Sequence, residues 1–176
     1  MAYNPKISPK RTIGTMTSYI RLIRYPYEEP YHLDLGITAS NGYARGRLQL
    51  YVGAQELAHW AEGIETFPVH ARSVLLWQYG SERPEDRCAC YFRMRVFTED
   101  AQGHSAILFR FNNNADLPHR QISEFCIRTD PAPINRLGQL LREFAKLKHD
   151  VLEWSPTSGR LFESLEDPEQ EFADAR

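Results

Sequence analysis

Residues 32–52, HLDLGITASNGYARGRLQLYV, contain two alternating segments around a tight turn. Apolar residues occupy every second position on each side, namely Leu33, Leu35, Ile37, Leu48, Leu50 and Val52. Between the segments stands Asn41-Gly42, a strong hairpin signal because both residues tolerate positive φ angles. Alternation with a period of two places one face of a strand on a core and the other in solvent. The stretch therefore predicts an antiparallel hairpin with one buried face.

Further strands and a helix are predicted around this hairpin. Residues 54–66 change period, because Leu57, Trp60, Ala61 and Ile64 recur at helical spacing. Pro68 ends that helix. Alternating or β-branched segments bounded by turn residues predict strands over 17–24, 73–79, 88–97, 104–111 and 121–129.

A second, longer helix is predicted over residues 131–153, after an N-cap at Asp130 and a first-turn proline at Pro131. Its apolar stripe must cover another element, and a sheet is the obvious partner. The order βββαββββα lacks the regular strand–helix alternation of a parallel fold. We therefore expect an α+β protein: a mostly antiparallel sheet of about six to seven strands, with the C-terminal amphipathic helix packed on one face.

The chain has 176 residues, 42% of them hydrophobic and 25% charged, which is typical of one globular domain. We place that domain at residues 16–155, after a flexible polar segment at 1–15. Residues 156–176 are expected to be a disordered acidic tail, because from Glu163 onward there are six acids and one base. Met16 precedes the first predicted strand and is an alternative start to Met1.

Residues 1–15 contain no apolar core of a signal peptide, and no apolar run reaches the ~18 residues of a membrane span. Three cysteines without a secretion signal favour reduced thiols, so we expect a cytoplasmic protein. Cys88 and Cys90, with Cys126, fit zinc spacing poorly and are interpreted as core residues. We expect neither a metal nor a cofactor.

Glycine-rich phosphate loops and nucleophile motifs are absent from the sequence, so no catalytic residue is assigned. His32 and Asp34 share a face of their predicted strand, which makes an acid–base pair geometrically possible. A small hydrolase-like enzyme using these groups or His104 is therefore kept as an alternative. Solvent-facing polar residues explain them equally well.

Arginines and tyrosines recur on the predicted strands, and we expect them to form a binding face opposite the helices. A proline-interrupted loop rich in tyrosine would lie at its edge. The predicted partner-binding residues are Tyr25, Tyr27, Glu28, Glu29, Tyr31, Arg45, Arg47, Tyr51, Tyr91, Arg93 and Arg95. A single-stranded nucleic-acid binder is the alternative, and the balance of 21 basic and 23 acidic residues weakens it. A solvated sheet face whose arginine stems cover apolar surface is the plainest interpretation.

Three segments, YIRLIRYPYEEPYHLDL (19–35), RMRVFTEDAQGHSAILFRFNNN (93–114) and INRLGQLLREFAKL (134–147), resemble small uncharacterised bacterial α+β domains. Some families of this type occur among the immunity proteins of polymorphic toxins, which are compact inhibitors with charged binding faces. The resemblance implies a binding protein rather than an enzyme, with a protein partner such as a cognate toxin. It transfers no functional residue.

Overall fold

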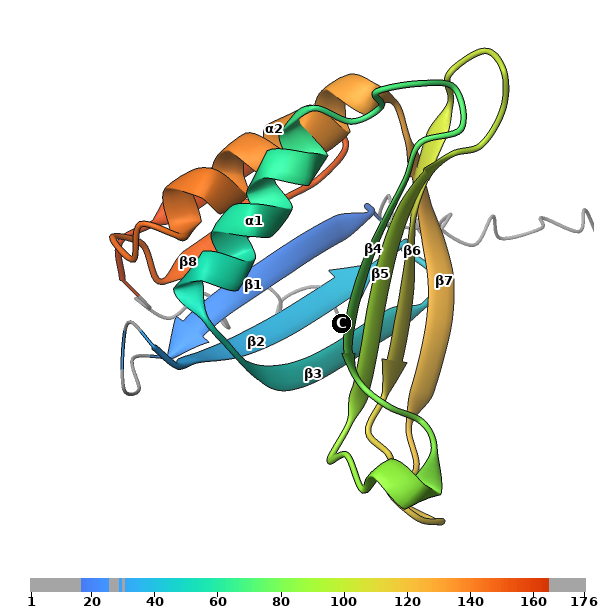
Figure 1. The fold of residues 1–176 in the computed structure, drawn as a ribbon, viewed down its shortest axis with the longest axis vertical. Coiled ribbons are helices and arrows are strands. Elements are labelled where there is room, and N and C mark those ends of the chain that lie inside the picture. Colours follow the sequence, from blue (N-terminus) through green and yellow to red (C-terminus); the bar gives the residue numbers. More distant parts are fainter. Residues whose placement is uncertain (1–16, 26–28, 30, 165–176) are drawn as a thin grey trace, which may run out of the picture.

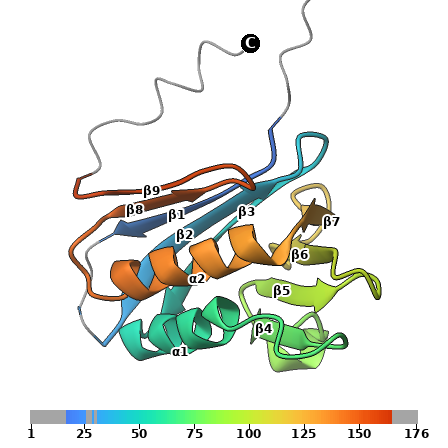
Figure 2. The same ribbon diagram turned by 90° about the horizontal axis from the view of Figure 1, so that it is seen from above.

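The computed structural model describes residues 17–25, 29 and 31–164. These residues form nine β-strands, two α-helices and one short 3₁₀-helix. The strands belong to two antiparallel sheets, and the two helices lie side by side in the angle between them (Figures 1 and 2). The fold is α+β, as the sequence predicts.

The first sheet has five strands in the order β3-β2-β1-β8-β9. Its hairpin β2–β3 has the predicted alternation, and Gly42 takes the positive φ of 88° that the turn requires. The strands are β1 (Tyr19–Tyr25), β2 (Leu33–Ser40), β3 (Arg45–Val52), β8 (Val151–Trp154) and β9 (Gly159–Phe162).

The second sheet has four strands in the order β4-β5-β6-β7. A 3₁₀-helix, Pro84–Asp86, lies between the first two strands. Inward residues such as Phe92, Met94 and Val96 alternate with outward arginines. The strands are β4 (Val74–Gly80), β5 (Tyr91–Thr98), β6 (Ser105–Asn112) and β7 (Ile122–Thr129).

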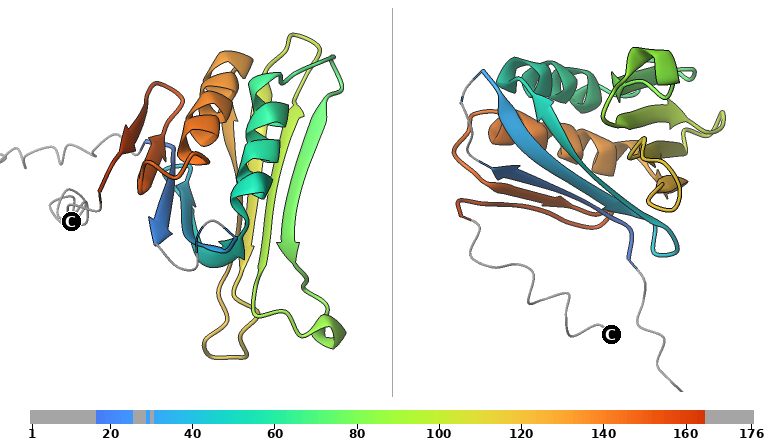
Figure 3. Two further views of the ribbon diagram at one scale, coloured as in Figure 1. Left: turned by 60° about the vertical axis from the view of Figure 1, so that its left-hand side comes forward. Right: turned by 90° about the horizontal axis from the view of Figure 1, so that it is seen from below.

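The helices α1 (Ala54–Glu65) and α2 (Pro131–Phe144) fill the angle between the sheets (Figures 2 and 3). α2 contacts β8 and β9 of the first sheet, whereas α1 contacts β4 of the second. The helices approach closely at Gly138, where any side chain would meet the backbone of Glu65. Both helices and both sheets thus share one core.

The two sheets meet at one corner, where β3 contacts β6 and β7. Gly46 of β3 lies against the ring of Phe111, and a Cβ atom there would overlap that ring. Ser123 Oγ donates a hydrogen bond to the carbonyl of Arg45 across the same corner, at 2.9 Å. The opposite edges, β9 and β4, lie apart with the helices between them (Figure 2).

The expectation of a single sheet of six to seven strands is wrong. Alternation with a period of two shows which side chains face inward, but it does not state which strands pair. Here α1 interrupts the chain after β3, and β4 begins a new sheet. The two apolar inner faces are then covered by the helices and by each other at the shared corner.

The second helix ends at Phe144, not at residue 153. Leu147 adopts a left-handed φ of 59°, and the chain turns back so that β8 pairs with β1. Trp154, which the sequence leaves beyond the helix, is 1% exposed and donates its indole N–H to the carbonyl of Pro133 at 2.8 Å. The apolar residues after Leu147 therefore belong to a strand that α2 covers.

The expected disorder from residue 156 onward is also wrong for its first part, because Gly159–Phe162 form β9 on the edge of the first sheet. The expectations for residues 1–15 and for the acidic end of the chain fall outside the described residues. The seven strands and the helix predicted before residue 130 are present, although β5 begins at Tyr91 rather than at Cys88.

We predict that Gly138→Ala lowers the free energy of unfolding by about 1–3 kcal/mol, because overpacking outweighs the gain in helix propensity. The added Cβ would lie 2.5 Å from the backbone nitrogen of Glu65. Gly63→Ala is the matched control within the other helix, since its nearest neighbour would be Leu75 at 3.4 Å. Denaturant unfolding should show a loss for the first variant and none for the second, and equal effects would contradict the close contact.

Candidate functional site

The outward residues of the four-stranded sheet form one continuous surface, here called the outer face. Its central row crosses all four strands and contains Leu76, Arg95, Leu108 and Cys126 in register. Neither α1 nor α2 lies over this face, because both lie on the opposite side of the sheet (Figure 3).

Apolar side chains remain exposed on the outer face. Leu76 is 59% exposed and Val74 is 49% exposed. The exposed Arg95 guanidinium lies 5.1 Å from the centroid of the Phe97 ring, within reach of a cation–π interaction. Arg95 has no ion pair with any described residue. The centre of the face thus combines apolar groups with one arginine that has no acidic partner.

The other arginines on the outer face are neutralised by carboxylates. Glu124 forms salt bridges with Arg93 at 3.1 Å and with Arg110 at 3.3 Å. Arg110 also contacts Glu82 at 2.8 Å, and Arg128 contacts Glu99 at 3.0 Å. Burial raises the pKa of Glu82, but hydrogen bonds from Arg110 and Asn112 outweigh it and hold that pKa below its ordinary value. The face therefore has mixed charge.

The single arginine–tyrosine face expected from the sequence is wrong, because its residues lie on two sheets. Arg45, Arg47 and Tyr51 are exposed on β3 of the five-stranded sheet, whereas Arg93 and Arg95 are on β5. Tyr91 is only 6% exposed and offers little surface to a partner. The equal alternation of both strands predicted their outward side chains, but not that they belong to different sheets.

The expected recognition loop is tied to the domain by a buried arginine. Arg24 is 5% exposed, and its guanidinium hydrogen-bonds to Glu29 and, at 2.6 Å, to Asp150. It also donates to the carbonyls of Leu147 and His149, both at 3.1 Å. Glu29 is therefore a structural counter-ion in this fold.

The tyrosines of this loop differ in their exposure. The Tyr25 ring lies over Gly36 of the neighbouring strand, so it packs on the sheet. Tyr31 is 80% exposed and remains available to a partner. Tyr27 and Glu28 lie outside the described residues.

Arg24→Met should lower the free energy of unfolding by about 3 kcal/mol, because it leaves two partly buried carboxylates and two carbonyls without their donor. Arg128→Met is the control, since Arg128 forms a salt bridge while 73% exposed and should cost less than about 1 kcal/mol. Chemical denaturation measures both. Equal losses would show that Arg24 is no more than a surface ion pair.

The side chains proposed for an acid–base pair or for catalysis, Asp34 and His104, form hydrogen bonds within the fold. Both carboxylate oxygens of Asp34 accept hydrogen bonds from Gln49 Nε2, each at 2.7 Å. His32 precedes β2 and does not lie within it. His104 Nδ1 lies 2.6 Å from Asp100 Oδ2 in the β5–β6 turn. Asp100 also accepts the backbone N–H of Gln102 at 3.0 Å. This cluster closes a hairpin, and the hydroxyl of the neighbouring Ser105 donates to the carbonyl of Gly103 at 3.1 Å.

The hydrogen bond to Asp100 raises the pKa of His104 and lowers the pKa of Asp100. The histidine contribution to stability is therefore complete below about pH 6.5 and is lost as pH rises through the folded-state pKa. The aspartate contribution exists above about pH 4 and is lost as pH falls through its folded-state pKa.

We predict that Asp100→Asn lowers the pKa of His104, because the negative charge that stabilises the imidazolium is removed and a neutral amide oxygen replaces the carboxylate as acceptor. An NMR titration of the histidine ring protons measures this directly. An unchanged His104 titration would contradict the hydrogen bond.

All three cysteines are free and half-buried. Burial raises the pKa of the Cys90 and Cys126 thiols, so they are less ionised than ordinary thiols at neutral pH. Within the described residues, no three metal-ligating side chains gather at one point.

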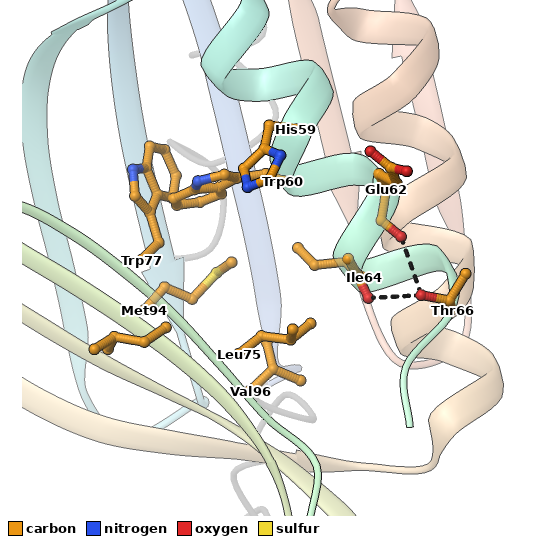
Figure 4. A pocket seen from close by; sticks show the side chains of 11 residues that line it. His59, Trp60, Glu62, Ile64, Thr66, Leu75, Trp77, Met94 and Val96 are labelled. Carbon is orange, nitrogen blue, oxygen red and sulfur yellow. Dashed lines mark hydrogen bonds between the residues drawn. The ribbon is translucent and has the colours of Figure 1, made fainter. Parts of the chain in front are cut away.

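A second surface feature lies beside the outer face, between α1 and β4. It is an open, mainly apolar hollow of about 400 Å³, here called the α1–β4 groove. Figure 4 shows α1 residues such as Trp60 on one side and Trp77, Leu75 and Met94 on the other. The Trp60 and Trp77 rings lie next to each other in the groove (Figure 4), and the Trp77 indole N–H donates to Glu56 at 2.9 Å. This hydrogen bond links β4 to α1 beside the groove.

Sequence reasoning missed this groove. Trp60 follows the helical apolar period of residues 54–66, and the predicted strand over 73–79 carries no sign of which strand it pairs with. A signal was present in Ser73–Tyr79, which contains no charged residue, but its meaning depends on β4 being an edge strand.

Comparisons with protein-family models, curated proteins and solved structures found no match. Among the described residues, neither helix has the length and apolar character needed to cross a membrane.

Proposed function

We propose that this chain is a protein-binding domain that contacts its partner through the outer face of the four-stranded sheet. The observation that carries the proposal is the central row of this face, in which the exposed Leu76 and Arg95 lie beside the half-buried Leu108. The immunity-type inhibitors that the sequence resembles belong to this functional class, with a toxin as partner.

The chemistry of the face fits a protein partner. Interface centres are enriched in arginine and aromatic residues, and binding energy concentrates in a few such side chains. Arg95 and Phe97 supply this combination, and Leu108 supplies apolar surface next to them. A partner with a carboxylate surrounded by apolar groups would match Arg95 in charge and Leu108 in polarity.

The same face suits nucleic acid less well. Phosphate binding requires uncompensated positive charge. On the outer face Glu82, Glu99 and Glu124 already neutralise three of the arginines. The exposed Arg45 and Arg47 lie on the other sheet, where their neighbours across the strand pair, Ser40 and Thr38, are polar. We favour the outer face because the exposed Leu76 lies directly beside Arg95 in its central row.

The test is affinity capture from the native host with a photo-crosslinking residue at Gln78, next to the central row. Leu108→Asp and Arg95→Glu should each reduce the yield of the cross-linked partner at least tenfold, because a hot-spot residue contributes about 2 kcal/mol or more. Arg47→Glu is the matched control, since it makes the same charge change on the other sheet.

Capture that survives Leu108→Asp and Arg95→Glu but is lost with Arg47→Glu would place the binding face on the five-stranded sheet and overturn the proposal. Circular dichroism and thermal unfolding of each variant show that the fold is retained. An unchanged yield in all three variants would equally contradict a role for the outer face.

A further inference from the structure

The backbone of β4 has one unpaired edge. β4 pairs with β5 on one side only, and the N–H of Thr98 donates to the carbonyl of Ser73 at 3.3 Å. In an antiparallel pair, residues alternate between bonding the partner strand and facing away from it. The register therefore turns the N–H and C=O groups of Val74, Leu76 and Gln78 away from β5. Among the described residues, no backbone group bonds to them on that side.

The other sheet edges carry the protective features that proteins use against unwanted pairing. Edge strands are usually blunted by charge, by shortness or by a covering segment. β3 carries Arg45 and Arg47, and β9 is a four-residue strand that carries Arg160. Along β7, Asn41 of the β2–β3 turn donates to the carbonyl of Cys126 at 3.3 Å. β4, with the sequence VLLWQYG, has no charge and no proline.

The α1–β4 groove lies directly beside this unpaired edge. Leu76 lines the groove although its side chain points to the outer face, so the hollow reaches the backbone at the edge. A strand added to β4 would continue the pleat of the sheet, and every second side chain would enter the groove. Those side chains would meet Trp60, His59 and Glu62 of α1.

The charge of α1 indicates which side chains fit. α1 contains three glutamates and no lysine or arginine. Glu65 is bonded to Arg142 and Glu56 to Trp77, whereas the exposed Glu62 has no ion pair within the described chain. A lysine or arginine entering the groove would therefore find an acidic partner at its rim.

We propose that β4 accepts an extended segment of a partner protein as a fifth strand of its sheet. The segment has apolar residues at every second position and a lysine or arginine among those that face Glu62. Main-chain hydrogen bonds to Val74, Leu76 and Gln78 supply affinity, and the groove selects the alternate side chains. The inference rests on the proposed function only in that the partner is a protein, since it uses a different surface.

A second copy of the chain fits the edge less well. In an antiparallel pair of two β4 strands centred on Leu76, both α1 helices would lie on the same side of the joined sheet. Each copy would then bring its Glu62, which has no ion pair within the described chain, to the same side of the joined sheet with no basic residue on α1 to offset it, which is unfavourable. The occupant we infer is therefore basic and apolar.

The test uses the full chain and a phage-displayed library of random decapeptides, followed by fluorescence anisotropy with synthetic copies of the enriched sequences. We expect alternating apolar residues with a lysine or arginine, and binding that weakens about tenfold with Glu62→Gln. Gln55→Ala is the control on the same helix, since Gln55 is exposed and does not line the groove. Enriched peptides without alternation would overturn the proposal.

Leu76→Pro tests the edge itself. The N–H of Leu76 faces away from β5, so proline removes a donor that no internal hydrogen bond uses, and edge strands tolerate proline in this orientation. Peptide binding should fall at least tenfold, whereas Leu76→Thr, which keeps the N–H, should retain most of it. Equal binding by both variants would exclude strand addition.

Methylation of single peptide nitrogens gives a test that leaves the protein unchanged. In strand addition only every second N–H of the peptide bonds to β4, so affinity should fall at alternate positions. Uniform effects along the peptide would overturn the proposal. A dimer of the chain that Leu76→Pro dissociates, seen by sedimentation, would also overturn it by showing that the edge is filled by a second copy.

Leu108→Asp separates this inference from the proposed function. Leu108 lies on the outer face, two strands from the edge, and should leave peptide affinity unchanged. If Leu108→Asp abolishes capture of the native partner while no peptide depends on Leu76, the outer face stands and strand addition fails. If peptides bind β4 but Leu108→Asp leaves capture of the native partner unchanged, strand addition stands and the outer-face proposal fails.

Discussion

The close contact between Gly46 and Phe111 is the constraint from which the architecture follows. It joins the two sheets at one corner, where β3 meets β6 and β7, and only a residue without a side chain allows this approach. The sheets diverge from that corner, and the helix pair fills the angle, itself tightened at Gly138. Because β4 is the strand farthest from the corner in its sheet, it is covered by α1 alone, and an unpaired edge and a groove remain there.

Arg24 is the second organising interaction, and it gives the charged residues around it a structural role. A buried guanidinium needs several acceptors, and the chain supplies them from Glu29, Asp150 and the turn after α2. Residues that look like a charged recognition loop are thus part of the internal structure. The same turn brings Val151–Trp154 onto β1, which ends the helix and extends the first sheet.

The arginines of this protein show why charge on a strand is a weak guide to a binding surface. Arg93, Arg110 and Arg128 are all outward, yet each is neutralised by a glutamate that lies elsewhere in the sequence. Arg95, in the same sheet, has no ion pair with a described residue, and its guanidinium lies over the Phe97 ring. The two functional surfaces that we propose therefore depend less on basic residues than on what remains uncovered: the apolar centre of the outer face and the backbone of β4.

The sequence by itself determined the strands up to residue 129, the β2–β3 hairpin, α1 and the start of α2, because hydrophobic period and turn chemistry are local properties. It also indicated which side chains point inward along each strand. Only the tertiary structure decided that there are two sheets, that α2 ends at Phe144, that Glu29 is a counter-ion, and that β4 is an unpaired edge. The reason is physical: strand pairing, ion pairing and coverage join residues far apart in the chain, and periodicity carries no information about which partner each will meet.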